Sequence, residues 1–249
     1  MRFIALLFLS LCLPLAVLRA QSAPVADSAA VSKKTTALDK VPATDSSTKQ
    51  QKPKEPVIHQ LRFGIDLYRI AANIMYPSKQ GYEIQVDYLF RKKLYLVAET
   101  GFGKGKVDYD NLQYDNNGYF FRLGVDQQFL DIVSVRDFDI GFIGARYGIG
   151  FGNRSEAHYL VPSPFGPAAE GTTPSQQFIV HWGEITGGIK VELWKGLFAG
   201  WNVRGKFMLN GGVFKELAPN YIPGYGKGDK TTSFDFSFYI SYALRWKGK

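Results

Sequence analysis

Histidine and cysteine, which often act as catalytic groups or metal ligands, are rare in this 249-residue chain, which has three histidines and one cysteine. The three histidines are His59, His158 and His181, and no two of them have the spacing of metal ligands. His181 and Glu184 form the one local pair that could activate a nucleophile, such as Ser155 or Ser175 in the long loop. Three positions apart on a strand, the two side chains would lie on opposite faces and could not cooperate. We therefore expect no enzymatic activity.

Two further segments could bind small ligands. GFGKGK (101–106) has closely spaced glycines and lysines, but no strand-loop-helix context surrounds it and no Ser or Thr follows the lysine, so it is not a phosphate loop. The acidic segment 108–115 lacks the spacing of a calcium loop. The net charge of +8 comes from basic residues spread along the chain, which does not favour nucleic-acid binding. We expect neither a cofactor nor a metal.

The start of the chain is typical of exported proteins. Arg2 precedes an apolar stretch that ends near Leu18, and Ala20 offers a cleavage site, so residues 1–20 are a predicted signal peptide. The only cysteine, Cys12, lies inside it, and the mature chain therefore has no disulfide. No later stretch is long and apolar enough for a transmembrane helix.

Residues 21–56 have a different composition from the rest. They are rich in Ser, Thr, Ala, Lys, Pro and Asp and contain no aromatic residue. Such a segment cannot bury enough apolar surface to offset its ordering entropy, so we expect a disordered tail. It would be a flexible spacer or, alternatively, a tether for a partner.

The elements that must position any site are strands. In TTSFDFSFYISYALRW (231–246), large apolar residues occupy every second position from Phe234 to Trp246. This period of two indicates a strand with one apolar and one polar face. In one segment, 138–151, the apolar parity changes near Gly141 and Gly144, which we interpret as a glycine bulge. The eight segments with alternation are 61–67, 82–90, 94–99, 119–126, 138–151, 184–193, 197–209 and 231–246.

The connections between these segments alternate in length. The second, fourth and sixth are short, whereas the first, third, fifth and seventh are long: 68–81, 104–117, 152–176 and 211–230. This alternation indicates an up-and-down meander with short turns at one end and long loops at the other, as in outer-membrane barrels. The sequence therefore predicts an all-β, eight-stranded antiparallel transmembrane β-barrel over 57–246. An even number of strands places both termini in the periplasm.

The alternative is a soluble lipocalin-like binding barrel with the apolar parity inside. The aromatic rings of that parity would overfill an eight-stranded interior, so we expect them to face lipid. The polar parity would then form a charge-paired interior, because unpaired buried charges are costly. The expected interior network comprises Arg62, Asp66, Glu99, Arg122, Asp126, Arg146, Glu184, Lys190, Arg204, Asp235 and Arg245.

Several segments resemble a family of small outer-membrane barrel proteins of unassigned function. They are GIDLYR (64–69), VAETGFG (97–103), GYFFRLGVD (118–126), IGARYGIGF (143–151), WGEITGGIKVELWKG (182–196) and AGWNVRGKF (199–207). The chain end also resembles the C-terminal insertion signal of such barrels, although Lys247-Gly248-Lys249 follow Trp246. The resemblance covers about 58–246. It implies an outer-membrane location and, as an alternative role, an accessory subunit of the barrel-assembly machinery.

The function expected from these features is binding. Eight strands leave no aqueous channel. Aromatic residues in the long loops could form a partner surface, or could instead fold over the barrel mouth; they include Tyr159, Phe165, Phe214, Tyr221 and Tyr225. We expect a non-enzymatic scaffold in the outer membrane that binds a membrane protein or lipoprotein. A lipid-modifying barrel enzyme is the remaining alternative.

Overall fold

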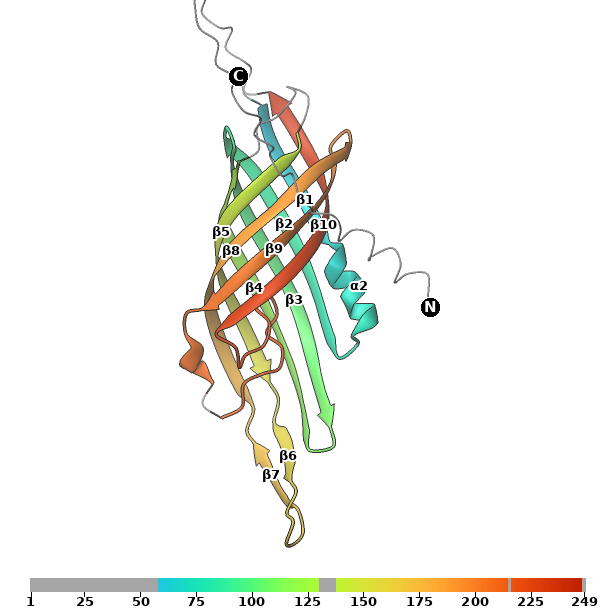
Figure 1. The fold of residues 1–249 in the computed structure, drawn as a ribbon, viewed down its shortest axis with the longest axis vertical. Helices are drawn as coiled ribbons and strands as arrows, with labels where there is room; N and C mark the ends of the chain where they lie inside the picture. Colours follow the sequence, from blue (N-terminus) through green and yellow to red (C-terminus); the bar gives the residue numbers. More distant parts are fainter. Residues whose placement is uncertain (1–57, 130–137, 215, 248–249) are drawn as a thin grey trace, which may run out of the picture. The chain divides into compact units, whose positions relative to one another are not determined.

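The computed structural model describes residues 58–129, 138–214 and 216–247. The predicted signal peptide and tail lie outside the described residues. The described part is all-β with one α-helix, α2 (Leu67–Met75), and one 3-10 turn, Gly211–Val213. The strands are β1 (Ile58–Asp66), β2 (Lys79–Arg91), β3 (Leu94–Tyr109), β4 (Leu112–Gln128), β5 (Ile140–Arg154), β6 (Ala157–Val161), β7 (Ala169–Thr173), β8 (Gln176–Trp194), β9 (Leu197–Met208) and β10 (Thr232–Lys247) (Figure 1).

All strands belong to one antiparallel sheet. Its order is β3-β2-β1-β10-β9-β8-β5-β4-β6-β7, and β3 also pairs with β4. Because of this additional pairing, each of the eight strands other than β6 and β7 has a hydrogen-bonded partner on both sides. β6 and β7 form a hairpin that pairs with the start of β4.

The described residues form ten strands, two more than the eight expected. The eight predicted segments correspond to strands, and the additional elements lie in the predicted loops. The hairpin of β6 and β7 occupies the predicted loop 152–176, and α2 occupies most of the predicted loop 68–81. The predicted loop 104–117 is mostly strand, because β3 and β4 pair continuously up to Tyr109 and Leu112. Five-residue strands flanked by prolines carry too little alternation to be recognised.

Burial alternates along the strands with the predicted period of two. On β10, the Phe234 side chain is 79% exposed, whereas Ser237 is fully buried. The polar parity forms the buried face of the sheet, and the large apolar residues lie on the exposed face. This is the reverse of the polarity of a water-soluble domain. Within the described residues, no helix is long and apolar enough to cross a membrane.

The predicted glycine bulge in β5 is wrong. The pairing of β5 with β8 continues without a shift from Ile140, opposite Lys190, to Arg154. Ile140 and Phe142 instead lie on the buried face, where they pack with Tyr95 and Val97 of β3. The change of apolar parity in the sequence therefore reflects a small apolar cluster on the buried face of the sheet. Register shifts occur elsewhere, at Leu89/Arg91 in β2 and at Glu192/Trp194 in β8.

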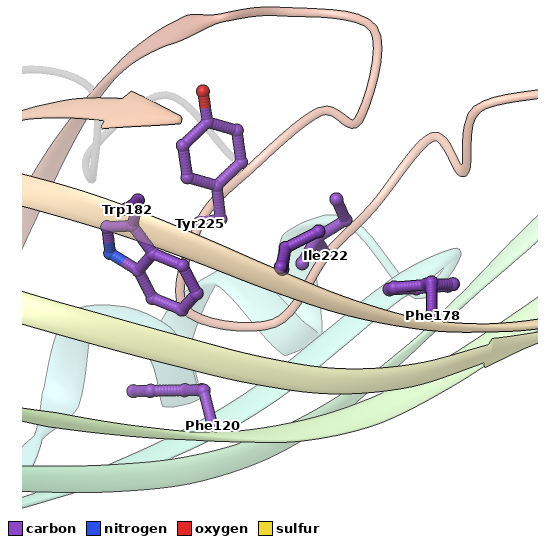
Figure 2. Packing of buried hydrophobic residues seen from close by; sticks show 6 residues of the cluster. Phe120, Phe178, Trp182, Ile222 and Tyr225 are labelled. Atoms are coloured by element: carbon purple, nitrogen blue, oxygen red, sulfur yellow. The ribbon is translucent and has the colours of Figure 1, made fainter. Parts of the chain in front are cut away.

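The segment between β9 and β10 packs against the buried face. Ile222 and Tyr225 form a cluster with wall residues Phe120, Phe178 and Trp182 (Figure 2). The segment turns sharply here, with a bridge between Ile222 and Gly226 and a positive φ of 78° at Gly224. This segment, residues 209–231, is called the inner loop below.

Candidate functional site

Arg122 of β4 is the centre of a buried cluster of charges. Its Nε lies 2.8 Å from Oε2 of Glu99, and its Nη1 lies 3.2 Å from Oε1 of Glu184. Nη2 also pairs with Glu83 of β2. The three carboxylates come from β3, β8 and β2, so one arginine links three strands. None of the Arg122 side chain is exposed.

Arg204 of β9 binds the same carboxylates from another strand. Its Nη1 lies 2.7 Å from Oε2 of Glu99, and its Nη2 lies 3.3 Å from Oε1 of Glu83. Tyr239 of β10 accepts a hydrogen bond of 2.6 Å from Arg204 and donates one to Glu83. Two arginines and a phenol thus share two glutamates. With Glu184, the cluster has two arginines against three glutamates, and Arg146, which lies 3.0 Å from Glu99, supplies the third positive charge.

A second group of charges continues from Glu99 towards the end of the sheet with the short turns. Arg146 lies 3.0 Å from Glu99 and 3.0 Å from Asp126. Lys190 lies 4.0 Å from Asp126 and 2.8 Å from Asp87. Asp87 in turn accepts a 2.5 Å bond from Arg62, whose guanidinium also stacks on the rings of Tyr95 and Phe198. The ion pairs therefore continue from one strand to the next.

A third group lies under the inner loop. Lys206 of β9 lies 2.6 Å from Oδ2 of Asp235, which also pairs with Arg69 of α2. Arg69 is 3.9 Å from Asp66 and 3.9 Å from Glu83, which connects this group to the central cluster. Lys206 additionally donates a 2.7 Å hydrogen bond to the carbonyl of Gly224. The charges thus hold the inner loop in place.

The structure gives each of the eleven predicted network residues an oppositely charged partner. Arg245 forms a separate pair with Glu192, at 2.8 Å, and stacks on Phe138. The other ten join one continuous set of pairs no longer than 4.0 Å: Arg62, Asp66, Glu99, Arg122, Asp126, Arg146, Glu184, Lys190, Arg204 and Asp235. Beyond the eleven, the connected pairs include Glu83, Asp87 and Lys206, which share the polar parity of the sequence, and Arg69 and Tyr239, which sequence reasoning missed. Tyr239 lies on the polar parity and could have been included on that ground.

The residues considered for catalysis do not converge. His181 is half-exposed and contacts the Tyr147 hydroxyl at 2.6 Å, while Glu184 is buried in the charge cluster, on the other face of β8. Ser155 donates its hydroxyl hydrogen to the carbonyl of Glu156 and accepts a bond from Asp115. No group of three metal-binding side chains occurs among the described residues.

The glycines of GFGKGK have a structural role. Gly103 and Gly105 lie on the buried face of β3, where a methyl group on either would come within 3.0 Å of Tyr221. Gly81 of β2 is the third side of this trough, and its added Cβ would lie 2.6 Å from the Tyr221 hydroxyl oxygen. The Asn116 side chain donates to the carbonyl of Tyr221. The glycines thus make room for the inner loop.

The five predicted partner-contact aromatics divide between two environments. Phe165, at the tip of the β6–β7 hairpin, is 98% exposed, and Tyr159 of β6 is also exposed. Phe214 is half-buried and packs edge-on against Phe178. The sequence left open whether Tyr221 and Tyr225 face a partner or fold inward, and in the structure both pack inward, against a glycine trough and an aromatic cluster on the buried face. Burial raises the pKa of both phenols.

Comparisons with known proteins bear on the fold and the family. No curated protein matches the chain. The chain is similar to three solved structures: a major outer membrane protein from Thermus thermophilus, Ail of Yersinia pestis and the N-terminal β-barrel domain of OprF from Pseudomonas aeruginosa. Identities are 10%, 7% and 11%, and TM-scores are 0.40, 0.37 and 0.31. The alignments cover 75%, 76% and 76% of this chain and 99%, 100% and 97% of the others.

A family model matches residues 2–249, which is nearly the whole chain, and the description of that family assigns it no function. The chain belongs to the family described as "Domain of unknown function (DUF6048)".

Proposed function

We propose that the eight strands other than β6 and β7 form a closed barrel that spans the outer membrane, with both termini in the periplasm. We further propose that the protein is a scaffold that binds a membrane protein or lipoprotein, and that it is neither an enzyme nor a channel. The observation that carries the proposal is the inverted polarity of the sheet, since ion pairs lie on its buried face and large apolar side chains on its exposed face.

Lipid is the environment that suits this polarity. On the exposed face, Leu123 is 66% and Phe234 is 79% exposed, and rings and branched aliphatic side chains surround them on neighbouring strands. Exposing so many large apolar groups to water is unfavourable by about 25 cal/mol per Å². In a bilayer the same groups are solvated by acyl chains. The interior of a bilayer has no water to bond the backbone N–H and C=O groups. Strands that are paired on both sides satisfy these groups with their neighbours.

The buried face argues against transport. Ion pairs extend from Arg62 to Asp235, and Ile222 and Tyr225 of the inner loop pack against Phe120, Phe178 and Trp182 on the same face. Eight-stranded barrels have an interior that side chains can fill. A filled and internally neutral interior supports a rigid scaffold.

The β6–β7 hairpin is the best candidate for a partner surface. It exposes Tyr159, Val161 and Phe165, of which Phe165 makes almost no contact with the rest of the chain. Exposed aromatic side chains are enriched at protein interfaces. The prolines at 162, 164 and 167 restrict the tip and lower the entropy lost on binding.

Purification of the tagged protein in mild detergent tests this proposal. The intact chain should retain a partner in stoichiometric amount, and a variant with 160–170 replaced by a short turn should lose it. A variant lacking 21–56 is the matched control and should keep it. An intact protein that purifies alone would contradict the scaffold proposal. Loss of the partner only from the variant without 21–56 would show that these residues, and not the hairpin, bind the partner.

A further inference from the structure

The wall between β2 and β10 is incomplete beyond the C-terminal end of β1. β1 ends at Asp66, opposite Tyr239 of β10, and its last pair with β2 joins Ile65 and Ile84. Beyond this point, residues 79–83 of β2 pair only with β3, and residues 232–238 of β10 pair only with β9, within the described part of the chain. Two strand edges are therefore left without a strand between them.

Helix α2 covers this gap. It continues directly from β1 and contacts both β2 and β10 (Figure 1). Asn73 bonds to the backbone of Gly81 on the β2 edge, and Asp66 accepts a 3.3 Å bond from the backbone N–H of Phe238 on the β10 edge. Tyr68 packs edge-on against Phe236, with ring centroids 5.5 Å apart. Side chains of the helix thus take over part of the bonding of a strand.

The polarity of α2 is opposite to that of a helix on a water-soluble protein. Its polar residues Arg69 and Asn73, one turn apart, point to the wall and the charge cluster. Its apolar residues face outward: Ile74 is 80% exposed, and Leu67, Ile70 and Met75 are exposed beside it. A surface helix in water turns its apolar stripe to the core. This helix turns it away.

The neighbours of α2 indicate what covers its outer face. Tyr82 of β2, with Phe234 and Phe236 of β10, flank the gap and are exposed on the same side as the apolar stripe. The stripe is therefore continuous with the apolar face of the strands. A helix satisfies its own backbone hydrogen bonds, so it is one of the few elements that can replace a strand in contact with lipid.

We propose that α2 is part of the membrane-facing wall and that its outer face, Leu67, Ile70, Ile74 and Met75, binds the acyl chains of the outer leaflet. This inference rests on the proposed membrane-spanning barrel. The occupant is hydrocarbon because the stripe carries no charged or hydrogen-bonding side chain. A protein partner on this stripe would have to displace lipid from the adjoining strands as well.

Site-directed spin labelling tests the proposal. Single-cysteine variants Ile74→Cys, Phe63→Cys and Phe165→Cys, in a Cys12→Ser background, are labelled and reconstituted alone into phospholipid vesicles. Collision of each label with oxygen, which partitions into lipid, is compared with collision with a water-soluble nickel chelate. Phe63, exposed on β1, is the lipid reference, and Phe165 is the water reference. Ile70→Cys is a second variant on the stripe should Ile74→Cys not fold.

The label at position 74 should show an oxygen-to-nickel ratio within about twofold of that at 63 and several-fold above that at 165. Ala72→Cys, which faces the wall, should be less accessible to both reagents. A lipid-like label at 63 with a water-like label at 74 would overturn the inference and leave the barrel proposal standing. Water-like labels at both positions would overturn both proposals.

Discussion

Asn73 of α2 forms two hydrogen bonds with the backbone of Gly81: its Nδ2 donates to the carbonyl at 3.0 Å, and the Gly81 N–H donates to its Oδ1 at 2.7 Å. A side-chain amide therefore provides the donor and acceptor that a neighbouring strand would offer. Edges of this kind are otherwise open to unwanted pairing, and in lipid their polar groups would be unsatisfied. The helix closes the edge without adding a strand.

Asn73→Leu should destabilise the protein, because both backbone groups of Gly81 lose their partner. An unsatisfied buried group costs about 1–3 kcal/mol. Urea unfolding in vesicles, followed by tryptophan fluorescence, measures the change in the free energy of unfolding. Ala71→Leu, on the outer side of the same helix, is the control and should have little effect. Equal effects of the two substitutions would show that the amide does not close the edge.

Arg122→Met should be among the most destabilising single substitutions. It removes one of the two arginines that Glu83, Glu99 and Glu184 share and leaves only Arg204 bridging the three, and breaking a buried pair costs about 3–5 kcal/mol. Adding Glu184→Gln should recover part of the loss, because one uncompensated charge is removed. Lys104→Met, on the exposed side of β3, is the control. If Arg122→Met unfolds at the same urea concentration as this control, the cluster does not stabilise the interior.

Gly81→Ala should displace the inner loop. The added methyl group would lie 2.6 Å from the Tyr221 hydroxyl oxygen but 3.8 Å from the ring carbon that carries it. Tyr221→Phe removes that oxygen, so the double variant should return to the wild-type state. Trypsin cleavage at the exposed Lys227 and Lys230 reports on the loop, which should be cut faster only in the single Gly81→Ala variant.

Gly183→Ala is the control for that experiment, because a methyl group added to Gly183 of β8 would meet no atom within 4 Å. Cleavage at the same rate in Gly81→Ala and Gly183→Ala would show that Tyr221 does not occupy the trough in the membrane. Persistent cleavage in the double variant would point to a cause other than the hydroxyl contact.

The purified protein should conduct no ions in planar bilayers. The ion pairs from Arg62 to Asp235 fill the interior together with the inner loop. Because the ion pairs remain when 211–230 is shortened, that variant should also stay closed to ions. Single-channel recording in concentrated KCl provides the test. Stable conductance steps of the wild-type protein would contradict a filled interior, and steps only in the shortened variant would make the loop the barrier.

The local pattern predicts much of this molecule because a strand has a strict period. The parity of β10 separates exposed Phe234 from buried Ser237, and the polar parity identifies the network residues before any contact is known. Helix α2 also had a signal: Asp66 caps it, Leu67, Ile70 and Ile74 follow at helical spacing, and a proline follows its end.

The path of the inner loop had no such signal. Tyr221 reaches a trough formed by Gly81, Gly103 and Gly105, which are far away in the sequence. Its aromatics are equally compatible with a partner surface when the sequence is considered alone. The same holds for β5, where only the pairing shows that Ile140 and Phe142 lie inside and that the strand is regular.

A spin-label scan along β10 in vesicles, from position 234 to 244, one cysteine at a time, tests the membrane-spanning barrel most directly. If lipid covers the apolar face of β10, oxygen accessibility should rise and fall with a period of two, with maxima at Phe234, Phe236, Phe238, Ile240, Tyr242 and Leu244. Labels at the positions between them should collide little with oxygen, because they point to the charge network. Maxima of nickel-chelate accessibility at the even positions would contradict a membrane-spanning barrel, because they would place the apolar face of β10 in water.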